Sequence, residues 1–292
     1  MTEPGDTVAE VLEDPDGLRT VRTSLSPSRA SDFQTCPLLY RYRTVDRLPE
    51  PPSSAAARGT LVHSVLEDLF DRAPADRTLA HAIDMLPGHW EQLVEEEPRL
   101  AGLFTPEQAA EQASWLASAS ELLGTYFRLE DPQWLEPAER ELRVDHVLES
   151  GLGLSGIVDR VDVAPDGRIR VVDYKTGRSP DPRYEDKALF QMKFYALVLW
   201  RTRGVVPTVL QLLYLADGQV LQYVPSESDL LATERKLEAL WEAIRASFDR
   251  QEFQPRRSAL CAWCAHQEHC PEFGGVVLPF PQVRLVEPTP VA

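Results

Sequence analysis

The spacing of hydrophobic residues changes along the chain from a helical period to strict alternation and back. Over 58–73, apolar residues three and four positions apart place one stripe on a helix. The same period continues over 76–129, with expected breaks at Pro87-Gly88, Pro98 and Thr105-Pro106. This part of the pattern predicts helices.

Between about 138 and 177, apolar and polar residues alternate in three stretches rich in Val and Ile, which is typical of β-strands. A helical period returns over 185–203 and ends at Gly204, a suitable C-cap. A second hairpin turns at Asp217-Gly218, and a long amphipathic helix follows over 227–253. This order of elements predicts a mixed α/β core.

The ends of the chain differ from its centre. Residues 1–23 are polar without a sustained period, which predicts a flexible N-terminal arm. We expect one domain over 24–273 with a helical insertion at about 74–133, and a Pro-rich tail over 274–292.

The hairpin predicted over 156–177 carries acids among residues that should be buried. Its turn, Pro165-Asp166-Gly167, is centred on Asp166, so Asp159 and Asp173 lie seven positions away on either side and can face each other. Lys175 projects to the same face as Asp173, because residues two apart in a strand share a face. An edge hairpin with solvated charges is the alternative. Asp162 is expected to be structural and to pair with Arg160 or Arg170.

Two carboxylates this close repel each other unless a cation lies between them. Hard oxygen ligands suit Mg²⁺ or Mn²⁺, and a nearby lysine can position or help to deprotonate a water and stabilise a phosphoryl group. The hairpin therefore predicts hydrolysis of a phosphodiester.

Asp159 followed by Asp173-Tyr174-Lys175 resembles the split PD-(D/E)XK signature, and the stretch as a whole resembles the RecB-like nuclease family. "RGTLVHSVLE" resembles the helical motif of that family and "QMKFYALVLW" its Gln-x-x-x-Tyr motif. The resemblance implies a restriction-endonuclease-like core, a mixed sheet flanked by helices. It also implies roles for seven residues: metal binding by His63, Asp159, Asp173 and the carbonyl of Tyr174, catalysis by Lys175, and DNA-backbone contact or lysine orientation by Gln191 and Tyr195. Glu141, on the preceding strand, can also approach the metal.

Four cysteines define a second candidate site. Cys261, Cys264 and Cys270 have the spacing C-x₂-C-x₅-C, and Cys36 lies 225 residues upstream. Four thiolates can hold a [4Fe–4S] cluster, while a zinc site that uses His266 or His269 and free thiols are the alternatives. The arrangement resembles the iron–sulfur members of the family, such as AddB-type nuclease domains and CRISPR-adaptation nucleases. It implies a cluster that joins Cys36 to the segment 258–273.

Composition narrows the possible classes of protein. The 292 residues are 43% hydrophobic, enough for a sizeable core, and the net charge of −16 argues against a protein that coats nucleic acid. This net charge remains compatible with a nuclease that has a local basic groove. The acidic N-terminus and the lack of a long apolar run predict a cytoplasmic protein without a membrane segment.

Basic and aromatic residues suggest where DNA would run. Tyr40, Arg41 and Arg43 alternate, a pattern that suits base stacking and phosphate contact, with a solvated helix end as the alternative. Arg160 and Arg178 flank the predicted active site.

Together these features predict a Mg²⁺- or Mn²⁺-dependent deoxyribonuclease, an exonuclease on single-stranded DNA in repair or recombination. The sequence has no phosphate-binding G-x-x-x-x-G-K-[ST] motif, so unwinding would need a partner such as a helicase or another repair protein. The alternative is a nuclease-derived DNA-binding or assembly subunit with little catalysis.

Overall fold

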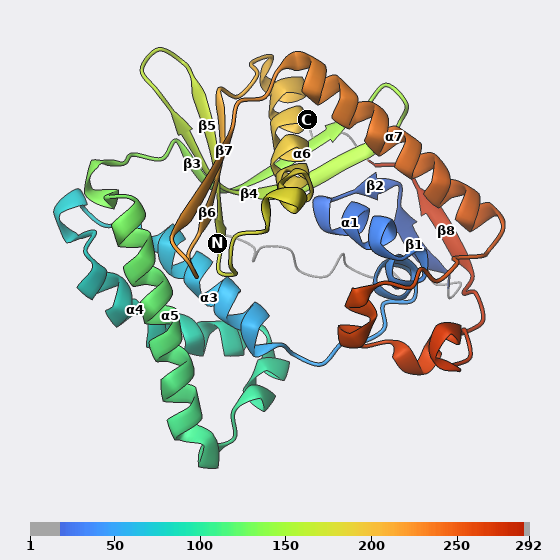
Figure 1. Cartoon of the computed structure of the whole chain (residues 1–292), viewed down its shortest axis with the longest axis horizontal. Coiled ribbons are helices and arrows are strands. Elements are labelled where there is room, and N and C mark those ends of the chain that lie inside the picture. Colours follow the sequence, from blue (N-terminus) through green and yellow to red (C-terminus); the bar gives the residue numbers. More distant parts are fainter. Residues whose placement is uncertain (1–17, 289–292) are drawn as a thin grey trace.

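A mixed β-sheet forms the centre of the molecule, and helices cover both of its faces (Figure 1). The computed structural model describes residues 18–288. The strand order is β2-β4-β5-β6-β7, and β3 also pairs with β4. The strands are β2 (Ser24–Leu25), β3 (Glu139–Val147), β4 (Gly153–Val163), β5 (Ile169–Lys175), β6 (Val209–Tyr214) and β7 (Gln219–Tyr223).

The hairpin of β4 and β5 has the register that its sequence predicts. Val161 pairs with Val171 and Arg160 with Val172, so the hairpin is centred on Asp166, and Gly167 takes the left-handed φ of 84° that the turn requires. The ladder ends at the pair of Arg160 and Val172. Asp159 and Asp173 are the next residues, at the point where regular pairing stops.

Two hydrophobic cores lie on opposite faces of the sheet. Val171 belongs to one and Val172 to the other, as the alternation of side chains in a strand requires. The first core packs against α1 (Pro27–Thr35), α6 (Glu185–Arg203) and α7 (Glu227–Asp249); the second packs against α3 (Ser54–Leu69), α4 (Leu79–Glu96) and α5 (Ala109–Leu129).

Short helical turns connect these elements. They are α2 (Pro37–Tyr40), the π-helix η1 (Arg41–Val45) and the 3-10 turns η2 (Pro74–Asp76), η3 (Pro98–Leu103), η4 (Pro106–Gln108), η5 (Pro132–Trp134), η6 (Pro182–Tyr184), η7 (Ala259–Trp263), η8 (Gln267–His269) and η9 (Pro271–Phe273).

The predicted ends of α6 and of the second hairpin are confirmed, since Gly204 is a left-handed C-cap and β6 and β7 pair across Asp217-Gly218. One predicted break is wrong: α4 continues through Pro87-Gly88. Tertiary packing explains this, because Leu86 and Trp90 on either side are buried in the second core.

The expected flexible arm needs a correction, because part of it pairs with the Pro-rich tail. Strand β1 (Arg19–Arg22) pairs in parallel with β8 (Val283–Val286), so parts of both segments form one small sheet. In Figure 1 the blue and red ends of the described chain lie side by side. The remainder of both expectations, over 1–17 and 289–292, lies outside the described residues. Within 18–288, no helix is long and apolar enough to cross a membrane.

Candidate metal centre and active site

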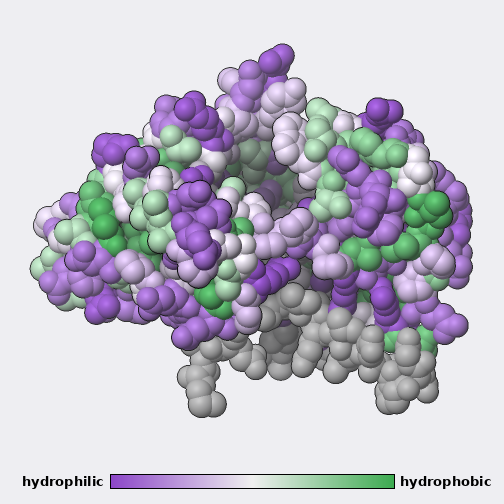
Figure 2. All heavy atoms as spheres, turned by 90° about the horizontal axis from the view of Figure 1, so that it is seen from below, coloured by the Kyte–Doolittle hydropathy of each residue, from purple (hydrophilic) through white to green (hydrophobic). Residues whose placement is uncertain are grey.

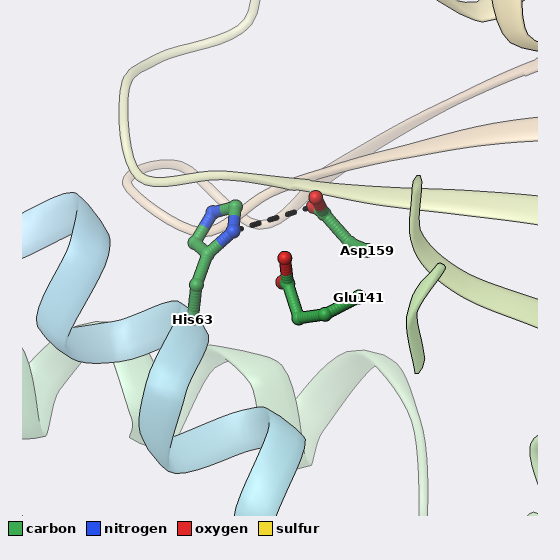
Figure 3. Close-up of side chains that lie close together, drawn as sticks. All are labelled: His63, Glu141 and Asp159. Carbon is green, nitrogen blue, oxygen red and sulfur yellow. Dashed lines mark ion pairs between the residues drawn. The ribbon is translucent and has the colours of Figure 1, made fainter. Parts of the chain in front are cut away.

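Three side chains from three elements point toward one another beside the end of the hairpin (Figure 3). His63 comes from α3, Glu141 from β3 and Asp159 from β4. One ligand atom of each lies within 4.8 Å of the others. Imidazole and carboxylate groups at this spacing can share one divalent cation.

Glu141 reaches this point through an unusual backbone conformation. Its neighbours Arg140 and Leu142 pair with Arg160 and Val158, so Glu141 lies opposite Asp159. Its φ is 41°, in the left-handed region, where a residue with a side chain costs about 1–3 kcal/mol. Such strain concentrates at functional sites. Sequence reasoning left Glu141 open, because alternation along one strand does not reveal which residue of a neighbouring strand faces Asp159.

Asp159 is tied to the backbone of Tyr174. Its Oδ2 accepts a hydrogen bond of 2.7 Å from the Tyr174 N–H and lies 3.4 Å from His63 Nδ1. The other ring nitrogen, His63 Nε2, lies 2.9 Å from the Tyr174 carbonyl oxygen. The histidine, the first aspartate and the carbonyl that the resemblance names are therefore neighbours.

A second chain of contacts begins at Asp173. Its Oδ2 lies 2.7 Å from Lys175 Nζ, which also donates a hydrogen bond of 2.8 Å to Gln191 Oε1. Gln191 Nε2 in turn donates to the Tyr195 hydroxyl at 2.9 Å. The Gln-x-x-x-Tyr pair on α6 therefore holds the lysine.

Gly156 on β4 makes room for this helix. A Cβ atom at Gly156 would lie 2.7 Å from Tyr195 Cε1, closer than carbon atoms pack. The absence of a side chain at Gly156 thus allows the tyrosine ring to lie against the strand.

The charges of the site shift its pKa values. Burial, followed by the charge of Asp159, raises the pKa of Glu141 to about 7 and that of Asp173 to about 6. Burial alone would lower the pKa of His63, but the Asp159 carboxylate raises it to about 9. Burial opposes ionisation of Asp159 too, yet His63 holds its pKa below the usual value. The three carboxylates of Glu141, Asp159 and Asp173 outnumber the two cationic groups of His63 and Lys175. This excess of negative charge favours binding of a metal ion.

Comparison with known proteins shows the family to which the sequence belongs. The sequence model described as the PD-(D/E)XK nuclease superfamily matches residues 24–271. The chain belongs to the PD-(D/E)XK nuclease superfamily.

Two individual proteins are similar to this PD-(D/E)XK nuclease. The Gene 69 protein of Mycobacterium phage D29 is 28% identical over 198 residues, 62% of this chain and 70% of that protein. A crystal structure from Eubacterium rectale, named "Putative exonuclease", has a TM-score of 0.54 at 15% identity and covers 84% of this chain and 88% of that one. The latter likeness shows the fold. Membership of the superfamily supports a hydrolytic nuclease.

Arg160, predicted to contact DNA, is instead a core residue of this nuclease. Its side chain is 0% exposed and bonds to Glu130 at 2.8 Å, Asp162 at 3.1 Å and the Tyr174 hydroxyl at 2.7 Å. Asp162 also pairs with Arg170 at 2.8 Å, so its predicted structural role is confirmed. The prediction for Arg160 was wrong because the side chain lies between the sheet and the end of α5.

The predicted DNA contacts of Tyr40 and Arg41 are also wrong. Tyr40 is fully buried, and Arg41 is buried in an ion pair of 2.8 Å with Asp46. Arg43 is 43% exposed but bonds to two carboxylates, Asp32 and Glu50. Arg178 is exposed on the loop that follows Lys175, and its contact with DNA stays a prediction.

The four cysteines line one cavity, although they come from both ends of the domain. Backbone N–H groups donate to three of the sulfurs: Arg256 to Cys36 and Ser258 to Cys261, each at 3.3 Å, and Glu272 to Cys270. Gly275 closes the turn tightly, because a Cβ there would lie within 2.2 Å of the Glu268 carbonyl oxygen. None of the four forms a disulfide.

Proposed function

We propose that this chain is a metal-dependent deoxyribonuclease that acts as an exonuclease on single-stranded DNA. The observation that carries the proposal is the meeting of His63, Glu141 and Asp159 at one point, with Asp173 and Lys175 beside it. This combination of oxygen and nitrogen ligands with a charged lysine is suited to phosphodiester hydrolysis.

The donor set fits Mg²⁺ or Mn²⁺. His63, Asp159 and Asp173 with the Tyr174 carbonyl would hold the ion, and Glu141 adds a carboxylate within reach of His63 and Asp159. The bound ion would supply an acidic water and neutralise charge on the phosphate.

Lys175 would hold the reacting phosphate and water. Burial alone would lower its pKa, but the carboxylate of Asp173 raises it, so the ammonium stays charged at neutral pH. A fixed positive charge stabilises the phosphate oxygens as negative charge develops. Gln191 and Tyr195 would orient the lysine through the contacts described above.

The DNA would enter the hollow that Figure 2 shows in the middle of one face. It separates the side of the molecule formed by α4 and α5 from the side that carries the cysteine segment (Figures 1 and 2). The name of the similar Eubacterium rectale protein supports exonuclease action. A role in repair or recombination rests on the resemblance to the RecB-like family, and a helicase or another repair protein would unwind the DNA.

The cysteines would hold a [4Fe–4S] cluster. Backbone N–H groups that donate to sulfur are suited to thiolate ligands. The histidines available to zinc contact carboxylates instead: His266 meets Glu50 at 2.8 Å and His269 meets Glu268 at 3.2 Å.

Cleavage of single-stranded DNA, labelled at the 5′ or the 3′ end, tests the proposal. With Mn²⁺, we expect mononucleotides or short oligonucleotides from the wild type and a loss of about 100-fold in Lys175→Ala. Arg245→Ala, on the exposed side of α7, is the control and should cleave at the wild-type rate.

Equal rates in the wild type and Lys175→Ala would refute the catalytic assignment. Tight binding of DNA without cleavage by either protein would favour the alternative, a DNA-binding or assembly subunit. For the cluster, a broad absorbance near 400 nm that is lost in Cys36→Ala supports iron and sulfide. One zinc in colourless protein purified without oxygen would refute it.

A further inference from the structure

A groove lies on the helical insertion between α4 and α5, apart from the metal centre. Its volume is about 380 Å³. No described residue of α3 or of the sheet lines it, so it does not belong to the active site. The lining residues are Pro87, Trp90, Glu91, Val94, Glu95, Gln112 and Leu116.

The floor of the groove is apolar and already packed. Trp90 is 6% exposed, and its ring centroid lies 4.8 Å from that of Trp115 and 6.1 Å from that of Phe104. Trp115 is fixed further by a hydrogen bond of 2.9 Å from its Nε1 to the Ser54 carbonyl. A rigid apolar floor lowers the entropy that a ligand loses on binding.

The rim of the groove is acidic. Glu91 and Glu95 are exposed and lie one turn apart on α4, a helix with four acidic residues and no lysine or arginine. Residues 79–129 contain eight acidic and two basic residues. This charge repels a DNA backbone, and it also repels the first 17 residues of the chain, which hold six acids and no lysine or arginine.

We propose that this groove binds a basic amphipathic helix of a partner protein. Two helices that flank an apolar trough accept a third helix along its hydrophobic stripe. Lysine or arginine beside that stripe would meet Glu91 and Glu95. The surface is independent of the proposed nuclease chemistry, because none of its residues contacts the metal centre.

Fluorescence anisotropy with synthetic peptides of about 18 residues, long enough for a helix, tests the proposal on the full chain. The probe carries leucines at helical spacing with lysines elsewhere; one control is its scrambled sequence and the other has glutamate in place of lysine. We expect binding of the basic amphipathic peptide alone. The double variant Glu91→Lys/Glu95→Lys should weaken it about 10-fold or more and should gain binding of the acidic peptide.

The matched control variant is Glu238→Lys/Glu242→Lys, which reverses two charges one turn apart on α7. It should bind the basic peptide like the wild type, and both double variants should keep wild-type DNA cleavage. If both double variants lose the same affinity for the basic peptide, or if the scrambled peptide binds equally well, the interaction depends on net charge alone. Either result would overturn the proposal. So would a dimer in sedimentation that Glu91→Lys/Glu95→Lys dissociates, because the occupant would then be a second copy.

Discussion

Glu141 and Asp173 hold protons more tightly in the folded protein than in the unfolded chain. Burial raises the pKa of Glu141 from 4.5 to about 7 and that of Asp173 from 3.8 to about 6. Their contribution to stability is therefore complete below their ordinary pKa values and is lost as the pH rises through 6 to 7. Asp159, whose pKa is lowered, contributes the opposite trend, but only in the acidic range.

We therefore expect the melting temperature of the metal-free protein to decrease as the pH is raised from about 5 to about 8, the range that spans these pKa values. Mn²⁺ binds deprotonated ligands, so its stabilising effect should grow over the same interval. Thermal melts with and without Mn²⁺ measure both trends. In Glu141→Gln the fall should be smaller and Mn²⁺ should stabilise less. A Mn²⁺ effect that does not change with pH would contradict the assignment.

Gly156→Ala should lower the rate of DNA cleavage about 10-fold or more, because the new methyl group displaces the ring of Tyr195. The displaced hydroxyl would release Gln191, and with it Lys175. Steady-state cleavage measures the effect. Gly102→Ala is the control, since its Cβ would meet no atom within 4 Å. If both variants cleave alike, the close approach does not position the lysine.

At the residue scale, the sequence predicted the members of the hairpin but misassigned buried basic residues. The turn at Asp166 and the alternation of strands set the positions of Asp159 and Asp173, because both depend on local geometry. Arg160 and Arg41 were expected at the surface, since isolated arginines are rarely buried. Their burial depends on partners distant in sequence, such as Glu130, 30 residues from Arg160.

At the scale of elements, one buried ion network connects the helical insertion to the catalytic strand. Arg160 on β4 bonds to Glu130 at the end of α5 and to the hydroxyl of Tyr174 on β5. Tyr174 also supplies the backbone groups that meet Asp159 and His63. The network thus holds α5 against the strand that carries the site.

Arg160→Met should reduce the free energy of unfolding by about 3 kcal/mol or more, because it leaves buried carboxylates without a partner. Arg160→Lys should cause a smaller loss, since lysine keeps the positive charge but lacks the planar guanidinium group. Urea denaturation measures both. Arg168→Met, which removes an exposed pair with Asp166, should have little effect. Similar losses in Arg160→Met and Arg168→Met would mean that the buried network is not stabilising.

The course of α4 through Pro87 is an element that local signals did not predict. A proline and a glycine in succession disfavour a helix, but the gain from burying Leu86 and Trp90 against α3 and α5 exceeds this cost. By contrast, Thr105 and Gln108 form a capping box at the predicted break, because this motif needs only four consecutive residues.

At the scale of the whole molecule, the two ends of the described chain are joined twice. The first junction is the pairing of β1 with β8, and the second is the cavity where Cys36 meets the three later cysteines. Both close a loop that contains nearly the whole domain, so the contacts at each junction must offset the entropy lost when that loop closes.

Cys36→Ser should therefore lower the melting temperature of the protein by several degrees, if the thiols share a metal or cluster whose binding contributes to folding. Thr35→Ala, which changes the neighbouring side chain in the same cavity, should lower it less. Calorimetry compares the two, and metal analysis of each protein reports what the thiols hold. Equal melting temperatures with equal metal content would show that Cys36 is not a ligand.

The sequence by itself determined the order of the main helices and of the central strands β3 to β7, the register of the central hairpin and the pairing of Gln191 with Tyr195. All of these follow from interactions between residues near one another in the chain, where period and turn chemistry are decisive. Only the tertiary structure brought Glu141 opposite Asp159, buried Arg160, joined β1 to β8 and formed the acidic groove on α4 and α5. These depend on which surfaces meet when the layers pack, and the free energy of that packing comes from residues far apart in sequence.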